Sequence, residues 1–80
     1  MLLEIITPDK RIYSGEVKLV QLPGTVGSFE ILKNHAPIIS TLEKGKIKVV
    51  EEDGKILFFD VEGGIVENKE NKIVVLVESI

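Results

Sequence analysis

The side chains that could perform chemistry in this sequence are few. His35 is the only histidine, and there is no cysteine. A Ser-His-Asp triad or a histidine metal cluster would have to be built on this one imidazole, and thiol nucleophiles, zinc ribbons and disulfides are excluded. Glu51, Glu52 and Asp53 are consecutive carboxylates, but neighbouring residues of a strand point to alternate faces and do not converge on a metal ion. We therefore expect no catalytic residue, no cofactor and no metal site.

The glycine-bearing segment 23–28, Pro-Gly-Thr-Val-Gly-Ser, is a poor candidate for a nucleotide site. It lacks the Gly-Lys-Ser/Thr ending of a phosphate loop, and it leads into the strand-like residues 29–32 instead of a helix. We interpret Gly24 and Gly27 as residues with positive φ or as part of a bulge at a sheet corner.

The basic residues do not predict nucleic-acid binding. Lys44, Lys46 and Lys48 recur at every second position, so they would share one side of a strand, but no aromatic side chains lie between them. The net charge of −3 gives no overall attraction to phosphate backbones or anionic lipid. We expect a solvated or edge-protecting face and no nucleic-acid partner.

Short apolar runs separated by turn residues dominate the chain and predict strands. They are rich in Val, Ile, Leu and Phe, and no window keeps the i, i+3, i+4, i+7 spacing of an amphipathic helix. The runs are residues 2–6, 17–22, 29–32, 38–42, 47–50, 56–61 and 73–77. Between two of them, Asp53-Gly54 predicts a tight type I′ turn that joins residues 47–52 to residues 55–61.

The spacing of these runs predicts the architecture. Eighty residues form one domain, and the connections are too short for crossover helices. We expect an all-β fold with essentially no helix: an antiparallel two-sheet β-sandwich, or flattened barrel, over residues 1–80. Gly63-Gly64 within the strand-like residues 60–67 predicts a bulge or a close backbone approach. Because there is no export signal and no run near the roughly 20 apolar residues of a membrane span, we expect a soluble, unexported protein.

Several strands are apolar on both faces, which leaves surplus hydrophobic surface. Leu57, Phe59 and Val61 would point to one side and Phe58 to the other, and residues 73–77 are continuously apolar. A sandwich of this size has one interior, so some of these side chains must lie outside it. They are either scattered surface residues, which are normal, or a patch that a partner covers.

The order of short motifs along the chain resembles the epsilon subunit of F-type ATP synthases from one end to the other. The motifs are Thr-Pro, Ser-Gly-Glu, Pro-Gly, His-Ala-Pro and Gly-Gly, within residues 6–9, 13–16, 22–24, 27–39 and 62–67. The resemblance implies a non-catalytic rotor subunit at the foot of the central stalk. There it would couple the gamma subunit to the membrane c-ring, so that ion flow drives ATP synthesis. It also implies a peripheral position on the cytoplasmic face of the bacterial inner membrane.

The same resemblance implies which residues contact the partners. They are Ser28, Glu30, Asn34, His35 and Ser40, with segment 27–37 placed against the c-ring. Many relatives read Gly-Glu-Leu-Gly where this chain reads Gly-Ser-Phe-Glu, so the acid has moved two positions along and stays on the same face of a strand. Asn34 stands where relatives often have Gly, and Asn tolerates the left-handed conformation. The sequence ends just after its last strand, so we expect the C-terminal helical hairpin of longer members, with its nucleotide site, to be absent.

Two alternatives belong to other classes of protein. A free-standing β-sandwich that binds a sugar or peptide would need an exposed aromatic platform, which three phenylalanines and one tyrosine barely supply. A single-domain hydrolase would need a nucleophile and base anchored on His35 alone. We therefore expect protein partners and no small-molecule substrate.

Overall fold

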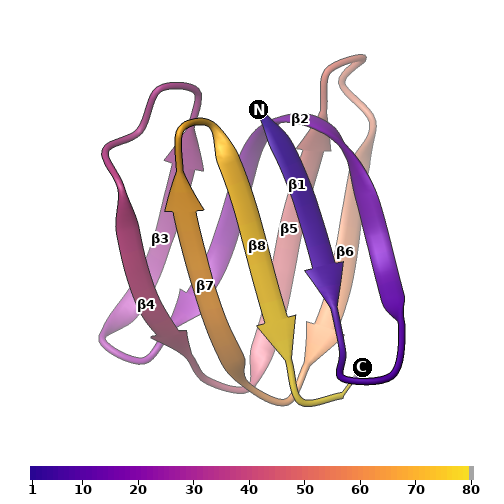
Figure 1. The fold of residues 1–80 in the computed structure, drawn as a ribbon, viewed down its shortest axis with the longest axis vertical. Coiled ribbons are helices and arrows are strands. Elements are labelled where there is room, and N and C mark those ends of the chain that lie inside the picture. The colour runs from indigo at the N-terminus through magenta and orange to yellow at the C-terminus, as the bar shows by residue number, and fades with distance from the viewer. Residues whose placement is uncertain (80) are drawn as a thin grey trace.

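A computed structural model of the chain describes residues 1–79, so the predicted domain end at Ile80 lies outside the described residues. The described part contains strands and no helix (Figure 1), which confirms the predicted all-β fold. The strands are β1 (Leu2–Ile6), β2 (Arg11–Gly24), β3 (Gly27–Leu32), β4 (Ile38–Leu42), β5 (Gly45–Glu51), β6 (Ile56–Val61), β7 (Gly64–Lys69) and β8 (Lys72–Val77). Within residues 1–79, no helix of a length and apolarity suited to crossing a membrane is found.

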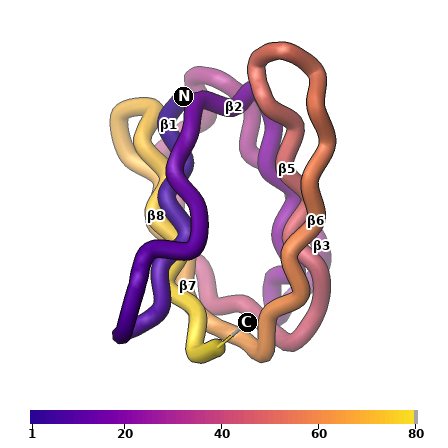
Figure 2. Tube along the Cα trace, turned by 90° about the vertical axis from the view of Figure 1, so that its right-hand side faces the viewer, coloured from indigo at the N-terminus to yellow at the C-terminus, as the bar shows by residue number. Residues whose placement is uncertain are grey.

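The long strand β2 folds one sheet into two layers. Its first half pairs with β1, and its second half pairs with β3 and β5. The strand order is β1-β8-β7-β4-β2-β5-β6, with β3 beside β2 and β1 also pairing with β2. We call β4, β7, β8, β1 and the first half of β2 the front layer, and the second half of β2 with β3, β5 and β6 the back layer. Figure 2 shows the two layers facing each other, as the predicted sandwich requires.

One strand pair and one turn depart from the expected pattern. All strand pairs are antiparallel except β1 with β8, which are parallel. The predicted type I′ turn at Asp53-Gly54 is wrong, because that turn needs positive φ at both residues and only Gly54 has it, at 93°. Instead the Gly54 N–H donates to the Glu51 carbonyl at 2.9 Å, and residues 52–55 connect β5 to β6. Two consecutive positive φ values occur between β7 and β8, at Glu70 (52°) and Asn71 (60°).

The core fills the space between the two layers with aliphatic side chains that alternate with outward residues along each strand. The buried hydrophobic residues are Met1, Leu3, Ile5, Val17, Val20, Leu22, Ile31, Leu42, Ile47, Val49, Val61, Val66, Ile73, Val75 and Val77. At Gly64 the backbone of β8 approaches so closely that an added Cβ would lie 2.2 Å from the Leu76 carbonyl oxygen. The close approach predicted at Gly63-Gly64 is therefore confirmed.

A tyrosine joins the two layers at one corner of the sandwich. Tyr13 lies in the first half of β2, and its hydroxyl donates to the Glu51 carboxylate of β5 at 2.5 Å. Its ring lies against Phe59 of β6, with the ring centroids 5.6 Å apart. Burial and the hydrogen bond to Glu51 raise the pKa of Tyr13 to about 12. The phenol is therefore neutral and stays a hydrogen-bond donor at physiological pH.

Candidate partner-binding surfaces

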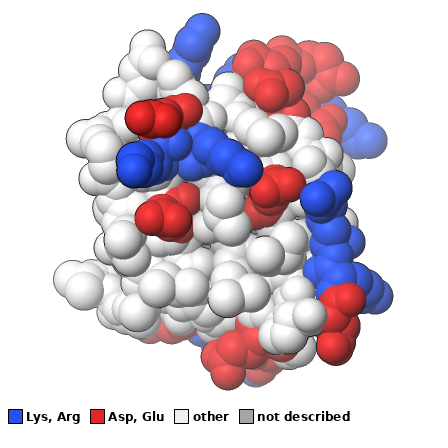
Figure 3. All heavy atoms as spheres, in the orientation of Figure 1, with Lys and Arg blue, Asp and Glu red and all other residues white. Residues whose placement is uncertain are grey.

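The front layer carries exposed aliphatic side chains on its outer face. Strand register places Thr41, Ile65, Leu76 and Ile6 in one row across β4, β7, β8 and β1, and Ile39 lies beside them with 67% of its surface exposed. We call Ile6, Ile39, Ile65 and Leu76 the front patch. Figure 3 shows that much of the lower half of this face is uncharged, while charged side chains gather above it. The ion pairs of Glu4 with Arg11 (3.5 Å) and Lys72 (3.7 Å) belong to this face.

The outer face of the back layer also carries an apolar row. Register aligns Ile56, Val50, Leu19 and Leu32 across β6, β5, β2 and β3. Phe58 lies next to this row with 59% of its surface exposed. Apolar side chains thus align in rows on both outer faces, which favours partner-covered patches over scattered surface residues.

The predicted contact residues do not lie together. Ser28 and Glu30 lie on the same face of β3, as predicted, and both are exposed. Asn34 and His35 follow the far end of β3, which is six residues and roughly 20 Å long at the usual strand rise. In Figure 1 the β2–β3 turn lies at the bottom of the sandwich and the β3–β4 loop at the top. Segment 27–37 therefore runs the length of the molecule and is not one contact surface.

Ser40 occupies a different position again. It lies opposite the fully buried Val66 across the β4–β7 pair, and directly opposed residues share a face of the sheet. Its side chain is half-buried, and its hydroxyl donates to the Thr41 carbonyl at 3.2 Å. The predicted contact residues therefore lie in three separate places: the outer face of β3, the β3–β4 loop and the inner face of β4.

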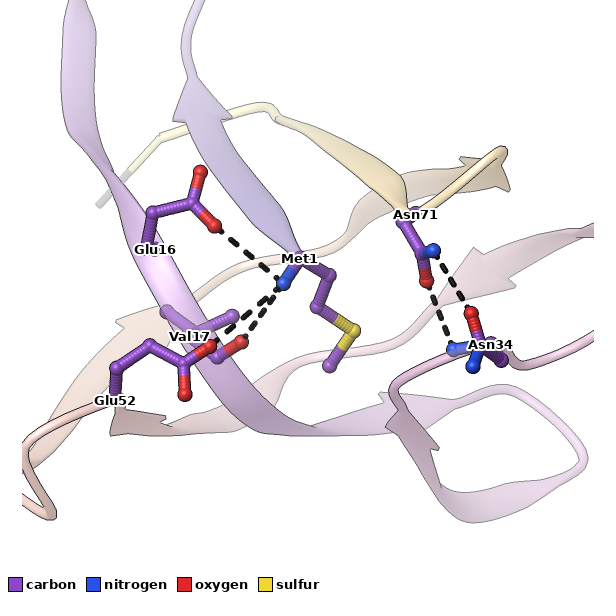
Figure 4. A network of polar contacts seen from close by, with 6 residues as sticks. All are labelled: Met1, Glu16, Val17, Asn34, Glu52 and Asn71. Carbon is purple, nitrogen blue, oxygen red and sulfur yellow. Dashed lines mark hydrogen bonds and ion pairs between the residues drawn. The ribbon is translucent and has the colours of Figure 1, made fainter.

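The β3–β4 loop has a defined shape. Asn34 has a φ of 65°, which confirms that it takes the left-handed conformation, and the His35 N–H donates to the Leu32 carbonyl at 3.1 Å. The Asn34 N–H donates to Asn71 Oδ1 at 2.8 Å, and Asn71 Nδ2 donates back to Asn34 Oδ1 at 2.9 Å (Figure 4). The His35 side chain is exposed, with Nδ1 at 2.7 Å from the Ala36 carbonyl oxygen. The hydrogen bonds between Asn34 and Asn71 thus join the β3–β4 loop to the β7–β8 turn.

The N-terminal ammonium group lies in a second polar cluster. The nitrogen of Met1 donates to the Val17 carbonyl at 3.2 Å and lies 3.5 Å from the Glu16 carboxylate and 4.0 Å from that of Glu52 (Figure 4). In Figure 1 the N-terminus, the β5–β6 hairpin and the β3–β4 loop all lie at the same end of the sandwich. Sequence reasoning did not single out this cluster, because it depends on strand pairing.

Two further residues were also missed. Val26 stands fully exposed at the tip of the β2–β3 turn, and its neighbour Thr25 is fixed to Thr41 by an N–H to carbonyl bond of 3.2 Å and a hydroxyl contact of 2.9 Å. Asn68 on β7 is buried. The exposure of Val26 could be inferred from its place between two turn residues. The burial of Asn68 could be found only by knowing which face of β7 points inward. Within residues 1–79, no group of three or more His, Asp or Glu side chains is placed to hold a metal ion.

Comparison with known proteins shows the family. The family model described as "ATP synthase, Delta/Epsilon chain, beta-sandwich domain" matches residues 1–80. The ATP synthase epsilon chain of Chlorobium limicola is 41% identical over 78 residues, which are 98% of this chain and 89% of that one. The epsilon chain of Desulfatibacillum aliphaticivorans is 39% identical over 79 residues, which are 99% of this chain but only 56% of that one.

The fold is also found in solved structures. A chain in a cryo-EM structure of the Euglena gracilis mitochondrial ATP synthase matches with a TM-score of 0.91 at 20% identity, and the match covers 100% of this chain and 52% of that one. A chain of the Tetrahymena thermophila enzyme matches with a TM-score of 0.82 at 19% identity, over 99% of this chain and 63% of that one. At such identities the likeness concerns the fold. Together with the family model and the bacterial relatives, it shows that this chain belongs to the ATP synthase delta/epsilon chain family and forms its β-sandwich domain.

Proposed function

We propose that this chain is a non-catalytic rotor subunit of an F-type ATP synthase, which fixes the gamma shaft to the c-ring so that torque from ion flow reaches catalytic sites on other subunits. The observation that carries the proposal is the family match over the whole chain, together with apolar rows on both outer faces. A monomer rarely leaves such rows uncovered. The bacterial relatives support a position on the cytoplasmic face of the inner membrane.

The end that carries the β2–β3 turn faces the c-ring in this proposal. Ser28 lies there, where the resemblance to epsilon subunits implies a c-ring contact, and the fully exposed Val26 forms the tip of the turn. The bonds between Thr25 and Thr41 hold the turn in place, so little ordering is needed when it binds.

In this proposal the gamma subunit covers the front face from the front patch, in the lower half of Figure 3, up to the His35 end at the top of the sandwich. An apolar centre edged by charged side chains is the usual anatomy of a protein interface, and here Glu4, Arg11 and Lys72 supply that edge. His35 lies too far from Ser28 for both to rest on the same ring loop. The two ends of the sandwich therefore meet different partners.

The alternative of a sugar- or peptide-binding module is less well supported. Tyr13, Phe29 and Phe59 pack against the core, and Phe58 alone is largely exposed. One ring does not make the aromatic platform that such ligands need. A hydrolase is disfavoured because His35, the only histidine, contacts the backbone of its own loop.

Cysteine cross-linking in the assembled enzyme tests the proposal. Cysteines placed singly at Ser28, His35 and Asp53 are combined with cysteines in the polar loop of the c subunit. Ser28→Cys should cross-link to the c-ring on oxidation, whereas His35→Cys and Asp53→Cys, from the opposite end, should not. Links from the last two alone would mean that the sandwich is inverted on the rotor. Failure of the tagged chain to co-purify with any ATP synthase subunit would refute the function itself.

Calorimetry on the isolated chain tests the non-catalytic part. Neither ATP binding nor ATP hydrolysis is expected, because the glycine-bearing turn enters β3 and not a helix. Saturable binding of ATP at physiological concentration would contradict this expectation.

A further inference from the structure

Asn68 is the one buried polar residue among residues 1–79, with 2% of its surface exposed. It points inward from β7, and in the strand register it lies opposite Ile38 on one side and the fully buried Ile73 on the other. Its Nδ2 donates to the carbonyl oxygens of His35 at 3.4 Å and Ala36 at 3.3 Å. Its Oδ1 is buried, and no other atom of the protein donates a hydrogen bond to it. The opposite orientation of the Asn68 amide would place its Oδ1 against both carbonyl oxygens, and two acceptors cannot form a hydrogen bond. The geometry therefore makes Nδ2 the donor to the loop.

This arrangement is unfavourable for the stability of the fold. A buried acceptor without a partner destabilises the native state, and a valine at this inward strand position would remove it. The carbonyls of His35 and Ala36 lie in an exposed loop, where water could replace the Asn68 amide. Fold stability alone therefore gives no reason for an asparagine here, whereas the shape of the loop does.

Asn71 restrains the same loop at the preceding residue. Its side chain makes two reciprocal hydrogen bonds with Asn34, of 2.8 and 2.9 Å, and both residues have positive φ. The front layer thus fixes the loop at three successive residues: the amide group of Asn34 and the carbonyls of His35 and Ala36. A loop fixed before binding loses less conformational entropy when it binds.

We propose that Asn68 and Asn71 are positioning residues, which hold loop 34–36 in the shape that the gamma subunit binds, and that Asn68 does so at the expense of fold stability. Neither side chain has to touch gamma. The inference rests on the proposed function, in which the His35 end contacts gamma.

Two variants separate loop positioning from folding. Asn68→Val removes the orphan acceptor together with the donor to the loop. Asn71→Gly keeps a residue that accepts positive φ, so that the β7–β8 turn survives while both amide bonds to Asn34 are lost. Lys69→Val is the matched control, because it adds a valine to an exposed position of the same strand.

The first measurement uses the free chain. Hydrogen exchange of the Asn34 and His35 amides should accelerate about five- to tenfold in both test variants, as expected for the loss of one net hydrogen bond, and stay unchanged in the control. The urea midpoint of Asn68→Val should equal or exceed that of the wild type. A lower midpoint with unchanged loop exchange would show that Asn68 is an ordinary structural residue and would overturn the proposal.

The second measurement is the affinity of the full chain for gamma bound to the catalytic head, prepared without this chain. Both test variants should bind about five- to tenfold more weakly than the wild type and the control, in proportion to the loss of loop order. Wild-type affinity in variants whose loop is loosened would overturn the positioning role. A wild type with no affinity for gamma would instead refute the proposed function, so the two failures can be told apart.

Discussion

The hydroxyl of Tyr13 is expected to be worth a measurable part of the stability of this sandwich. Tyr13→Phe removes only the bond to Glu51 and leaves the ring against Phe59. A hydrogen bond to a charged group contributes about 1.5 to 3 kcal/mol net, and partial exposure of both residues reduces this to about 1 to 2 kcal/mol here. The total free energy of unfolding for a chain of 80 residues is about 4 to 12 kcal/mol, so the loss of this bond removes a considerable fraction of it. With a urea m-value of about 1 kcal/mol/M, the midpoint should fall by about 1 to 2 M.

The same bond should make stability depend on pH in the alkaline range. The pKa of Tyr13 is raised from its ordinary value of 10.0 to about 12 in the folded chain, first by burial and then by Glu51. The contribution of Tyr13 to the free energy of unfolding is thus complete below about pH 10 and is lost as the pH rises through about 12. The reason is that the tyrosine hydroxyl loses its proton at a lower pH in the unfolded chain than in the folded one. The relevant quantity is the difference in stability between wild type and Tyr13→Phe, because contributions that the two chains share cancel in it. That difference should shrink between about pH 9 and about pH 12.

Urea unfolding followed by circular dichroism measures both effects. Glu51→Gln is the matched control, because it keeps an acceptor for the hydroxyl but removes the charge. Burial remains in that variant, so its alkaline loss of stability should be smaller than that of the wild type without vanishing. Equal midpoints for wild type and Tyr13→Phe at neutral pH, together with a difference that stays constant up to about pH 12, would refute the assignment.

Three further substitutions should destabilise the fold by different amounts. Gly64→Ala places a Cβ 2.2 Å from the Leu76 carbonyl oxygen, so the main chain must move, and a thermal melt should show a loss of about 3 kcal/mol or more. Gly54→Ala meets no atom within 4 Å but forces alanine to a φ of 93°, so its cost should be about 1 to 2 kcal/mol, and an unchanged melting temperature would argue against a strained turn. Lys46→Ala breaks an exposed 2.8 Å ion pair with Asp60, and its effect in urea unfolding should stay below about 0.5 kcal/mol.

Local sequence patterns predict the strands well where an apolar run ends at turn residues on both sides. The predicted runs 2–6, 38–42 and 56–61 coincide with β1, β4 and β6. The pattern did not predict the first half of β2 as a strand, because residues 11–16 are mostly polar and exposed or half-buried, and their pairing with β1 is what holds them extended. Turn type was equally hard to predict. The Asp-Gly pair fits several hairpin loops, whereas Glu70-Asn71 adopts two positive φ values because the register of β7 and β8 leaves room for only two residues.

The candidate surfaces were predicted less completely than the strands. Ser28 and Glu30 share a face because alternation along a strand is local, and that part is confirmed. Their separation from Asn34 and His35 was not predicted, because it depends on β3 being a full-length strand and not part of a loop. The burial of Asn68 is a tertiary property in the same sense, since a polar residue near a turn is usually solvated.

The parallel pairing of β1 with β8 has a consequence for the time course of folding. The first strand of the sandwich has β2 as a neighbour almost at once, but its other edge stays open until residues 72–77 arrive. Pairing across nearly the whole chain closes a long loop, and folds dominated by such contacts typically form in milliseconds to seconds, not microseconds. During that interval β1 presents an apolar strand with unpaired backbone groups, which is a template for pairing with other chains. Interrupted synthesis or proteolytic loss of β8 should therefore yield an aggregation-prone chain.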